Sequence, residues 1–360
     1  MRYFLKKPIL SAMVSVSSIK LSDAEKKLLT RYNPLGITLF ARNIETPLQV
    51  KNLIAEIKEA VERDDILVAV DQEGGRVARF KPPFFKSYMA QRSIGALEEE
   101  KEQERAAYLQ AFLIAEELKK VGVNLNYAPC CDVLFEQTGP VLKSRCFSRD
   151  EKLVAKLASV MVDTYLENNI IPCIKHVPGH GRAQVDPHLE LPVLDFSLKE
   201  LKKDFYPFEV LAQKSPMMMT AHIVLKSMDD VPVTQSKKII SNIIRKEIGF
   251  DGFLISDAID MHALKGTLSE KTKLSLDAGC DAVCYCMGEL DGLIEVLENT
   301  PPLQDKALER LFQMQKVIKK QSETKVSEPL LQEYMKIKQK APFFEEDYDA
   351  VEILHKLKQK

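Results

Sequence analysis

The sequence lacks an excess of charge of either sign. Its 51 lysines and arginines face 52 aspartates and glutamates, so the formal net charge is -1. Proteins that attract nucleic acid through their overall charge are positive, and this balance therefore excludes nucleic acid as a general partner and favours a small polar or neutral ligand. The sequence also lacks an apolar run near the roughly 20 residues that span a bilayer, so we expect no membrane partner. It contains no low-complexity tract.

The sequence also lacks the cysteine pattern of a protein stabilised by disulfide bonds. The seven cysteines are an odd number, and most lie in apolar runs rather than at the spacings of a small disulfide-rich domain. We interpret them as free buried thiols in a reducing compartment and expect a cytoplasmic protein. Metal binding by the adjacent Cys130 and Cys131, or by Cys284 and Cys286, is the alternative, but buried apolar thiols are favoured.

The N-terminal segment superficially resembles a short signal peptide, since residues 1–7 are basic and residues 8–16 are apolar. Serines interrupt the apolar run, however, and no cleavage pattern of small residues is clear. A capped helix begins directly afterwards at Ser22. We therefore predict that this segment is the first strand of the fold.

The chain alternates between short apolar runs and longer amphipathic segments, and 45% of its 360 residues are hydrophobic. The apolar runs predict eight strands, at residues 9–16, 36–40, 66–70, 123–128, 170–174, 217–221, 253–255 and 281–285. Apolar spacings of three and four predict helices at residues 23–30, 47–62, 98–121, 150–168, 197–213, 236–248, 269–278, 290–297 and 303–319.

Strands that are apolar on both faces and alternate with helices predict a parallel sheet covered on all sides. Eight such units are the number found in a (β/α)8 barrel, whose active sites lie at the carboxyl ends of the strands. A doubly wound open sheet is the alternative, but it gathers its ligand groups at one switch point. Here polar residues follow several different strands: Asp71, Asp132, Lys175, His176, His222 and Asp257. We therefore predict an α/β fold of the TIM-barrel type.

The pattern changes near residue 321, after which the sequence is charged and rich in lysine. We predict a single barrel domain over residues 1–321 and a helical, charged C-terminal extension over residues 322–360. The extension contains an aromatic and acidic patch at residues 343–348, before His355. It is expected to pack on the barrel or on a neighbouring subunit.

The densest group of chemically useful side chains lies at residues 174–188. This stretch holds three of the six histidines, a lysine and an aspartate, directly after an apolar run. Imidazole, with an unperturbed pKa near ~6.5, exchanges protons at neutral pH. Asp186 lies two positions before His188 and is placed to orient its ring. The segment therefore indicates acid–base chemistry.

Two further segments place carboxylates at strand ends. Asp71 precedes a Gly-Gly turn, where the backbone can approach a ligand and a carboxylate can accept paired hydrogen bonds from vicinal hydroxyls; a structural ion-paired turn is the alternative. Asp257 follows the seventh strand, where a carboxylate facing a general acid meets the requirement of retaining glycoside hydrolysis. Asp260 lies three residues further on and is expected to cap or pair rather than attack.

Together these segments resemble glycoside hydrolase family 3, in particular its bacterial β-N-acetylglucosaminidases of the NagZ type. The resemblance extends from about residue 7 to residue 321 and rests on five motifs in the family's order. They are residues 71–77 (DQEGGRV), 125–129 (LNYAP), 175–181 (KHVPGHG), 219–222 (MTAH) and 256–257 (SD).

The resemblance implies that Asp257 is the nucleophile and that His188, paired with Asp186, is the acid/base. Most glycosidases use a second carboxyl group in that role. Family 3 glucosidases commonly need a second domain for their acid residue, for which this chain has no room, and this favours the loop histidine. The resemblance implies no cofactor and no metal. It also implies that the sugar and its N-acetyl group are held by Asp71, Arg79, Arg145, Lys175 and His176.

Three positions depart from the family pattern. Val177 stands where phenylalanine is usual, and residues 143–146 match the arginine-bearing loop only loosely, so that Arg149 is an alternative to Arg145. Pro187 replaces the usual serine between the acid/base pair. Because proline fixes its own φ near about -65° and restricts the preceding residue, we predict a stiffer loop.

Three alternatives remain open. A metal-dependent hydrolase would use His176, His180 and His188 with Asp186 as ligands, although His180 is expected to make a loop-shaping hydrogen bond instead. A non-catalytic sugar-binding protein would retain the fold without the reaction. A phosphorylase of the same family would replace water by phosphate.

The expected reaction is removal of a terminal, nonreducing β-linked N-acetylglucosamine with retention of configuration. The resemblance implies that the natural substrates are N-acetylglucosaminyl-1,6-anhydromuramoyl peptides, which are imported fragments in peptidoglycan recycling. The expected partner is thus a small-molecule amino-sugar glycoside, and the oligomeric state is left open. His222 is expected to line the floor of the pocket.

Overall fold

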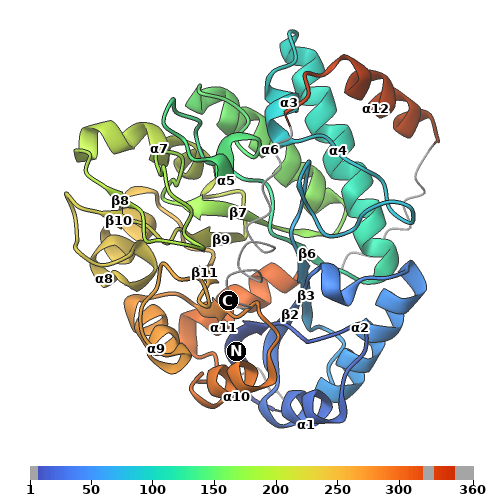
Figure 1. Ribbon diagram of the computed structural model, residues 1–360, viewed down its shortest axis with the longest axis vertical. Helices are drawn as coiled ribbons and strands as arrows, with labels where there is room; N and C mark the ends of the chain where they lie inside the picture. The colour runs from blue at the N-terminus through green and yellow to red at the C-terminus, as the bar shows by residue number, and fades with distance from the viewer. Residues whose placement is uncertain (1–6, 319–327, 345–360) are drawn as a thin grey trace.

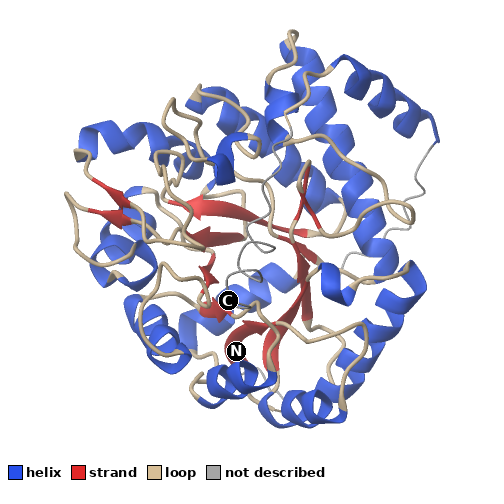
Figure 2. Ribbon diagram, viewed as in Figure 1, coloured by secondary structure: helices blue, strands red, loops and turns tan. Residues whose placement is uncertain are grey.

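A computed structural model describes residues 7–318 and 328–344 of the chain. Eight parallel strands close into a barrel in the order β1-β12-β11-β9-β7-β6-β3-β2. Figures 1 and 2 show this barrel at the centre of a ring of helices. Its strands are β1 (Leu10–Val14), β2 (Pro34–Leu39), β3 (Leu67–Val70), β6 (Leu125–Asn126), β7 (Ile171–Val177), β9 (Met217–Thr220), β11 (Phe253–Ala258) and β12 (Ala282–Cys284). The fold is a (β/α)8 barrel, as the alternation predicts.

Two small sheets lie outside the barrel, an antiparallel pair of β4 (Gln72–Gly74) with β5 (Val77–Ala78) and a parallel pair of β8 (Val193–Leu194) with β10 (Val224–Leu225). The longer helices are α1 (Asp23–Tyr32), α2 (Pro47–Val61), α4 (Glu100–Val121), α6 (Glu151–Glu167), α7 (Leu198–Leu211), α9 (Leu268–Ala278), α10 (Leu290–Glu298), α11 (Asp305–Gln315) and α12 (Glu328–Lys340). The shorter ones are η1 (Ala41–Asn43), α3 (Gln91–Gly95), α5 (Pro140–Lys143), η2 (Val233–Gln235) and α8 (Lys237–Ile239), which continues as the π-helix η3 (Ile240–Glu247).

Local sequence signals explain where several helices begin and end. The helices α1, α7 and α9 start with capping boxes, in which a hydroxyl residue and a glutamate three positions later satisfy each other's backbone N–H groups. Such a cap contributes about 1 kcal/mol. Gly122 and Gly279 follow α4 and α9 with φ values of 92° and 117°, a left-handed conformation that glycine adopts without steric cost.

Apolar side chains form two layers, one inside the barrel and one between the strands and the helices. Along β7, Ile171 and Cys173 belong to the inner cluster, whereas Ile174 and Val177 belong to the outer cluster. The strands are therefore buried on both faces, as their uninterrupted apolar runs predict. All seven cysteines are free thiols.

The strands differ from the predicted ones mainly at their carboxyl ends. Strand β7 continues to Val177, which pairs with Thr220 of β9, and β11 continues to Ala258, which pairs with Cys284 of β12. Lys175, His176 and Asp257 therefore lie within strands rather than after them, whereas Asp71 follows β3 as predicted. Strand β6 is shorter than predicted at both ends, since only Leu125 and Asn126 belong to it.

The predicted extension contains helix α12, which lies beside α4 at the edge of the molecule (Figure 1). Its Tyr334 and Ile337 are buried. The predicted domain boundary at residues 321 and 322, and residues 345–348 of the aromatic and acidic patch, lie outside the described residues. Within the described part, no helix is both long enough and apolar enough to cross a membrane.

Candidate active site

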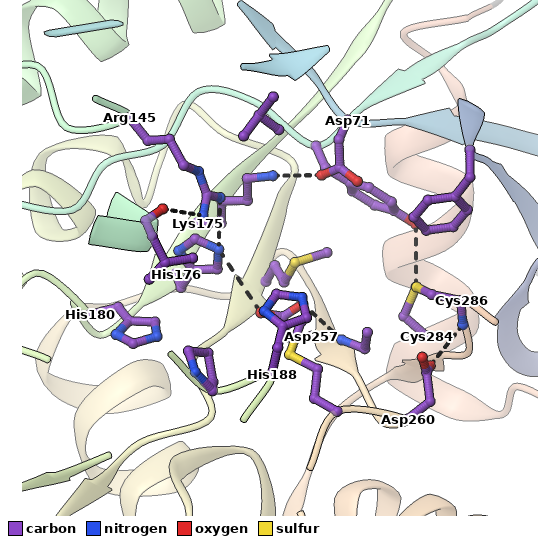
Figure 3. Close-up of a pocket in the computed structure, with 18 of the residues that line it drawn as sticks. Asp71, Arg145, Lys175, His176, His180, His188, Asp257, Asp260, Cys284 and Cys286 are labelled. Atoms are coloured by element: carbon purple, nitrogen blue, oxygen red, sulfur yellow. Dashed lines mark hydrogen bonds and ion pairs between the residues drawn. The ribbon is translucent and has the colours of Figure 1, made fainter. Parts of the chain in front are cut away.

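A pocket opens at the carboxyl ends of the barrel strands, and Figure 3 shows the side chains that line it. Seven of the eight residues predicted for the site line this one pocket. The eighth, Asp186, lies directly behind His188. The charged and imidazole groups of the lining are Arg42, Asp71, Arg76, Arg79, Arg145, Lys175, His176, His180, His188, Asp257 and Asp260.

Asp257 stands near the end of β11, and its side chain is 12% exposed. Its Oδ1 accepts a hydrogen bond from the backbone N–H of Ala258 at 2.8 Å, and its Oδ2 lies 3.9 Å from Nε2 of His176. Burial raises the pKa of Asp257, but His176, His222 and the Ala258 N–H together lower it more, so that it lies below its ordinary value. The group is therefore an ionised carboxylate at neutral pH, which a nucleophile requires.

The imidazole of His188 enters the pocket from the loop between β7 and β8. Its Nδ1 lies 2.7 Å from Oδ1 of Asp186, which also accepts a hydrogen bond from the His188 backbone N–H at 2.9 Å. A carboxylate accepts hydrogen bonds and cannot donate them, so Nδ1 carries the proton of this pair. Nε2 is left for proton exchange in the pocket.

The loop that carries His188 is docked against the segment after β11. The backbone N–H of Ala263 donates a hydrogen bond to the Pro187 carbonyl at 3.0 Å, and the N–H groups of Leu189 and Glu190 donate to the Asp186 carbonyl. These contacts place the imidazole on the same side of the barrel as Asp257.

A cluster of buried charges forms the opposite wall. Nζ of Lys175 lies 2.7 Å from Oδ1 of Asp71 and 2.7 Å from Oε1 of Glu73. The guanidinium of Arg145 forms a two-pronged pair with Glu73 at 2.8 and 3.0 Å, while Nη2 of Arg79 lies 3.5 Å from Asp71. This cluster presents fixed donors and acceptors to the pocket, as recognition of a polyhydroxylated ligand requires.

The cluster stays charged despite its burial. Burial raises the pKa of Asp71, but Lys175 and Arg79 hold it below its usual value. In the same way Arg145 and Lys175 overcome burial and hold the pKa of Glu73 far below its ordinary range. Burial acts to lower the pKa of Lys175, yet its two carboxylate neighbours keep it above the ordinary value.

The ring of His176 links this cluster to Asp257. Its Nδ1 lies 2.7 Å from Oδ2 of Asp132, and its Nε2 lies 3.3 Å from Nη2 of Arg145. Oδ1 of Asp132 meanwhile accepts a hydrogen bond from the backbone N–H of His180 at 2.6 Å. One buried carboxylate thus orients the ring and shapes the following loop.

The structure decides between Arg145 and Arg149, the two candidates for the pocket arginine that the loose match of residues 143–146 leaves. Arg145 lines the pocket, whereas Arg149 is exposed and lies on a different depression of the surface. Arg76 and Arg79 both line the pocket, and Arg76 hydrogen-bonds the Val141 carbonyl.

Two histidines behave differently from the expectations. The loop-shaping bond of His180 comes from its backbone, and within the described residues neither ring nitrogen has a hydrogen-bond partner. Burial lowers the pKa of His180 to about 4, so the ring is neutral at pH 7. His222 is not part of the pocket lining, because its Nδ1 lies 2.7 Å from the Thr234 hydroxyl and its Nε2 lies 3.0 Å from the Ala258 carbonyl behind the wall.

Several residues of the site were not predicted for it. Asp71 and Glu73 lie two positions apart, a spacing that places side chains on one face of an extended segment and could have indicated the second carboxylate. Arg42 donates hydrogen bonds to the Val16 and Cys286 carbonyls from the rim of the pocket. Asp260 accepts a hydrogen bond from the Cys286 N–H at 2.8 Å, which is a pairing role.

The described residues do not bring His176, His180 and His188 together around one point, as the alternative metal site requires. The one group there whose ligand atoms lie within 4.8 Å of one another is Cys130, Asp132 and His176. In that group the imidazole and the carboxylate already hydrogen-bond each other.

Comparisons with known proteins identify the family of this chain. The sequence model described as the glycosyl hydrolase family 3 N-terminal domain matches residues 9–317. A β-hexosaminidase of Bordetella avium (strain 197N) is 34% identical over 305 residues, which cover 82% of this chain and 86% of the relative. A β-hexosaminidase of Idiomarina loihiensis is 32% identical over 306 residues, with 84% and 91% covered.

Solved structures of family 3 enzymes have a similar fold. NagZ from Neisseria gonorrhoeae, in complex with N-trifluoroacetyl-D-glucosamine, superposes with a TM-score of 0.82 at 28% identity, covering 93% of this chain and 99% of that one. A family 3 β-N-acetylglucosaminidase from Paenibacillus sp. str. FPU-7 gives a TM-score of 0.83 at 26% identity, covering 92% and 67%.

The fold, the pocket and the comparisons define the class of protein: this chain is a glycoside hydrolase with a (β/α)8 barrel. It belongs to glycoside hydrolase family 3, with β-hexosaminidases of the NagZ type among its relatives. The resemblance inferred from the five motifs is confirmed.

Proposed function

We propose that the protein is a retaining exo-β-N-acetylglucosaminidase in which Asp257 is the nucleophile and His188 the acid/base. One observation carries the proposal. An ionised carboxylate and an imidazole oriented by Asp186 line the same pocket, beside the charged cluster of Lys175.

In the first step, Oδ2 of Asp257 attacks the anomeric carbon as His188 gives a proton from Nε2 to the departing glycosidic oxygen. A covalent glycosyl ester forms as the glycosidic bond breaks. In the second step, His188 takes a proton from water, whose oxygen attacks the same carbon and releases Asp257. Asp186 keeps the ring in one orientation throughout.

The sugar itself is proposed to bind at the charged cluster. Asp71 accepts hydrogen bonds from neighbouring hydroxyls, which Arg79 and Lys175 also contact. His176 lies 3.9 Å from Asp257, and Arg145 lies 3.3 Å from His176. These two residues are proposed to hold the N-acetyl side of the ring. The ligand in the gonococcal NagZ complex is an N-acylated glucosamine, which supports this sugar class.

We further propose that the natural substrates are N-acetylglucosaminyl-1,6-anhydromuramoyl peptides from peptidoglycan recycling and that the enzyme works in the cytoplasm. The seven free cysteines support a reducing compartment. Turnover of purified muropeptides, with release of free N-acetylglucosamine, tests the substrate. Cell fractionation tests the location.

Two variants test the catalytic roles. Asp257→Ala should nearly abolish turnover, whereas Asp260→Asn, which changes the neighbouring carboxylate of the pocket, should retain most of it.

His188→Ala should lower turnover of an alkyl glycoside by roughly 10²- to 10⁴-fold, because that leaving group needs a proton. A 2,4-dinitrophenyl glycoside needs little protonation and should lose far less in its bond-breaking step; equal losses on both would refute the acid role. Rates with and without phosphate separate hydrolysis from phosphorolysis.

A further inference from the structure

We propose that Tyr334, on the C-terminal helix α12, is a positioning residue for the charged cluster of the active site. The family match ends at residue 317, so Tyr334 lies outside the segment shared with the family model. The proposal rests on the proposed binding of the sugar by this cluster. It gives the C-terminal extension a part in substrate binding.

Helix α12 docks on α4 through a buried face and an ion-paired edge. Arg105 and Glu333 form a two-pronged pair at 2.7 and 2.7 Å, and Lys340 lies 2.7 Å from Glu102. Such exposed pairs contribute only about 0–1 kcal/mol each. Tyr334, by contrast, is 1% exposed, and its burial fixes the helix against the barrel.

The hydroxyl of Tyr334 makes two hydrogen bonds in this buried place. It accepts one from the backbone N–H of Met89 at 2.8 Å and donates one to Oε1 of Gln110 at 2.8 Å. Burial raises the pKa of Tyr334, so the hydroxyl keeps the proton that it donates. A buried hydroxyl with both roles satisfied holds its partners in one arrangement.

The side-chain amide of Gln110 connects the Tyr334 hydroxyl to the backbone of Glu73. Its Oε1 accepts from the Met89 N–H and the Tyr334 hydroxyl, so its Nε2 must face the other way, where it donates to the Glu73 carbonyl at 3.1 Å and the Met89 carbonyl at 2.9 Å. The space is tight as well. A Cβ at Gly74 would lie 2.2 Å from the Met89 carbonyl oxygen and 2.6 Å from Nε2 of Gln110.

Glu73 connects the backbone held in this way to the pocket. Its carbonyl bonds Gln110, and its carboxylate bonds both Lys175 and Arg145. A small shift of the Glu73 backbone would move the two cations that are proposed to hold the sugar. Binding depends on such positions to within a fraction of an ångström.

The test compares Tyr334→Phe with a matched control in the full-length chain. Tyr88→Phe also removes a buried tyrosine hydroxyl, one that donates to Glu117 at 2.9 Å, and the two rings are neighbours with centroids 5.9 Å apart. No hydrogen bond among the described residues links the Tyr88 side chain to Glu73. Both variants are expected to melt at a lower temperature than the wild type.

The experiment measures KM and kcat of each variant separately, on 4-nitrophenyl N-acetyl-β-D-glucosaminide and well below the melting temperatures. Tyr334→Phe should raise KM roughly three- to tenfold with a smaller change in kcat, because it loosens binding groups rather than Asp257 or His188. Tyr88→Phe should leave KM within about twofold of the wild type. An unchanged KM in Tyr334→Phe, or an equal rise in both variants, overturns the proposal.

Binding of N-acetylglucosamine measured by calorimetry gives a second, independent readout. The dissociation constant should rise with Tyr334→Phe by the same factor as KM and stay unchanged with Tyr88→Phe. If the wild type neither binds this sugar nor cleaves its glycosides, the proposed function has failed. If the wild type does both and Tyr334→Phe matches it, only the positioning role has failed.

Discussion

Replacing Lys175 by methionine removes the ammonium group that lies 2.7 Å from both Asp71 and Glu73, while it keeps an unbranched side chain. Lys175 is 2% exposed, so water cannot take the place of the lost charge. Both carboxylates then stay in a buried site with less positive charge around them. Arg145 still pairs with Glu73 at 2.8 Å, but Arg79 lies 3.5 Å from Asp71.

The structure gives the size and the pH dependence of the effect. Removing one partner of a buried ion pair costs about 3–5 kcal/mol. Because two arginines remain, we expect the lower end, about 3 kcal/mol of unfolding free energy at pH 7. Burial raises the pKa values of Asp71 and Glu73, but Lys175 helps to lower both below their ordinary values. The stability from a carboxylate with a lowered pKa is present above its unfolded pKa, near ~4, and is lost as pH falls through the folded pKa. The difference between wild type and Lys175→Met should therefore shrink below about pH 4.

Urea unfolding of both proteins between pH 7 and pH 3 measures this difference. Lys86→Met is the matched control, because Lys86 pairs with Glu117 at 2.9 Å but is 36% exposed. The control should lose no more than about 1 kcal/mol. If Lys175→Met loses as little as the control, or if its deficit does not change with pH, the account of the buried cluster is refuted.

Two shorter predictions concern the loop after β7. Burial lowers the pKa of His180 from 6.5 to about 4. Between pH 6.5 and pH 4 the unfolded chain therefore binds a proton that the folded chain does not bind. The free energy of unfolding of the wild type should fall by up to about 3 kcal/mol as the pH drops through this range. Urea unfolding of His180→Gln should show a shallower fall, while exposed His262→Gln should follow the wild type; identical slopes in all three would contradict the burial argument. Pro187→Ser should change kcat through the closure of the loop that carries His188, and unchanged steady-state kinetics would remove that idea.

The fold was predictable from the sequence because its signals are local and repeated. The run at residues 66–70 is apolar at every position, and the run at residues 217–221 is apolar at every position except Thr220. This pattern occurs where both faces of a strand are buried. The ends of β7 and β11 were not predictable in the same way. Lys175, His176 and Asp257 are polar. They belong to strands because pairing continues beyond them, to Val177 opposite Thr220 and to Ala258 opposite Cys284.

The site was predictable where a strand end or a motif marks it. Asp257, Lys175 and His188 line one pocket, as their positions and the family resemblance imply. Contacts between distant segments were not predictable. Gln110 is an ordinary helix residue in the sequence, and it meets Tyr334, 224 residues away, only when α12 packs on α4. Buried polar networks of this kind depend on which side chains meet in three dimensions.

The central claim is that Asp257 becomes covalently bonded to the sugar during the reaction. A fluorinated N-acetylglucosaminide with a good leaving group slows release of the covalent intermediate and traps it for digestion and mass spectrometry. The account predicts one added sugar on the peptide that contains Asp257 and none on the Asp257→Ala variant. A label on Asp260 or Asp71, or retention of configuration with no covalent species under conditions that accumulate it, would contradict the account.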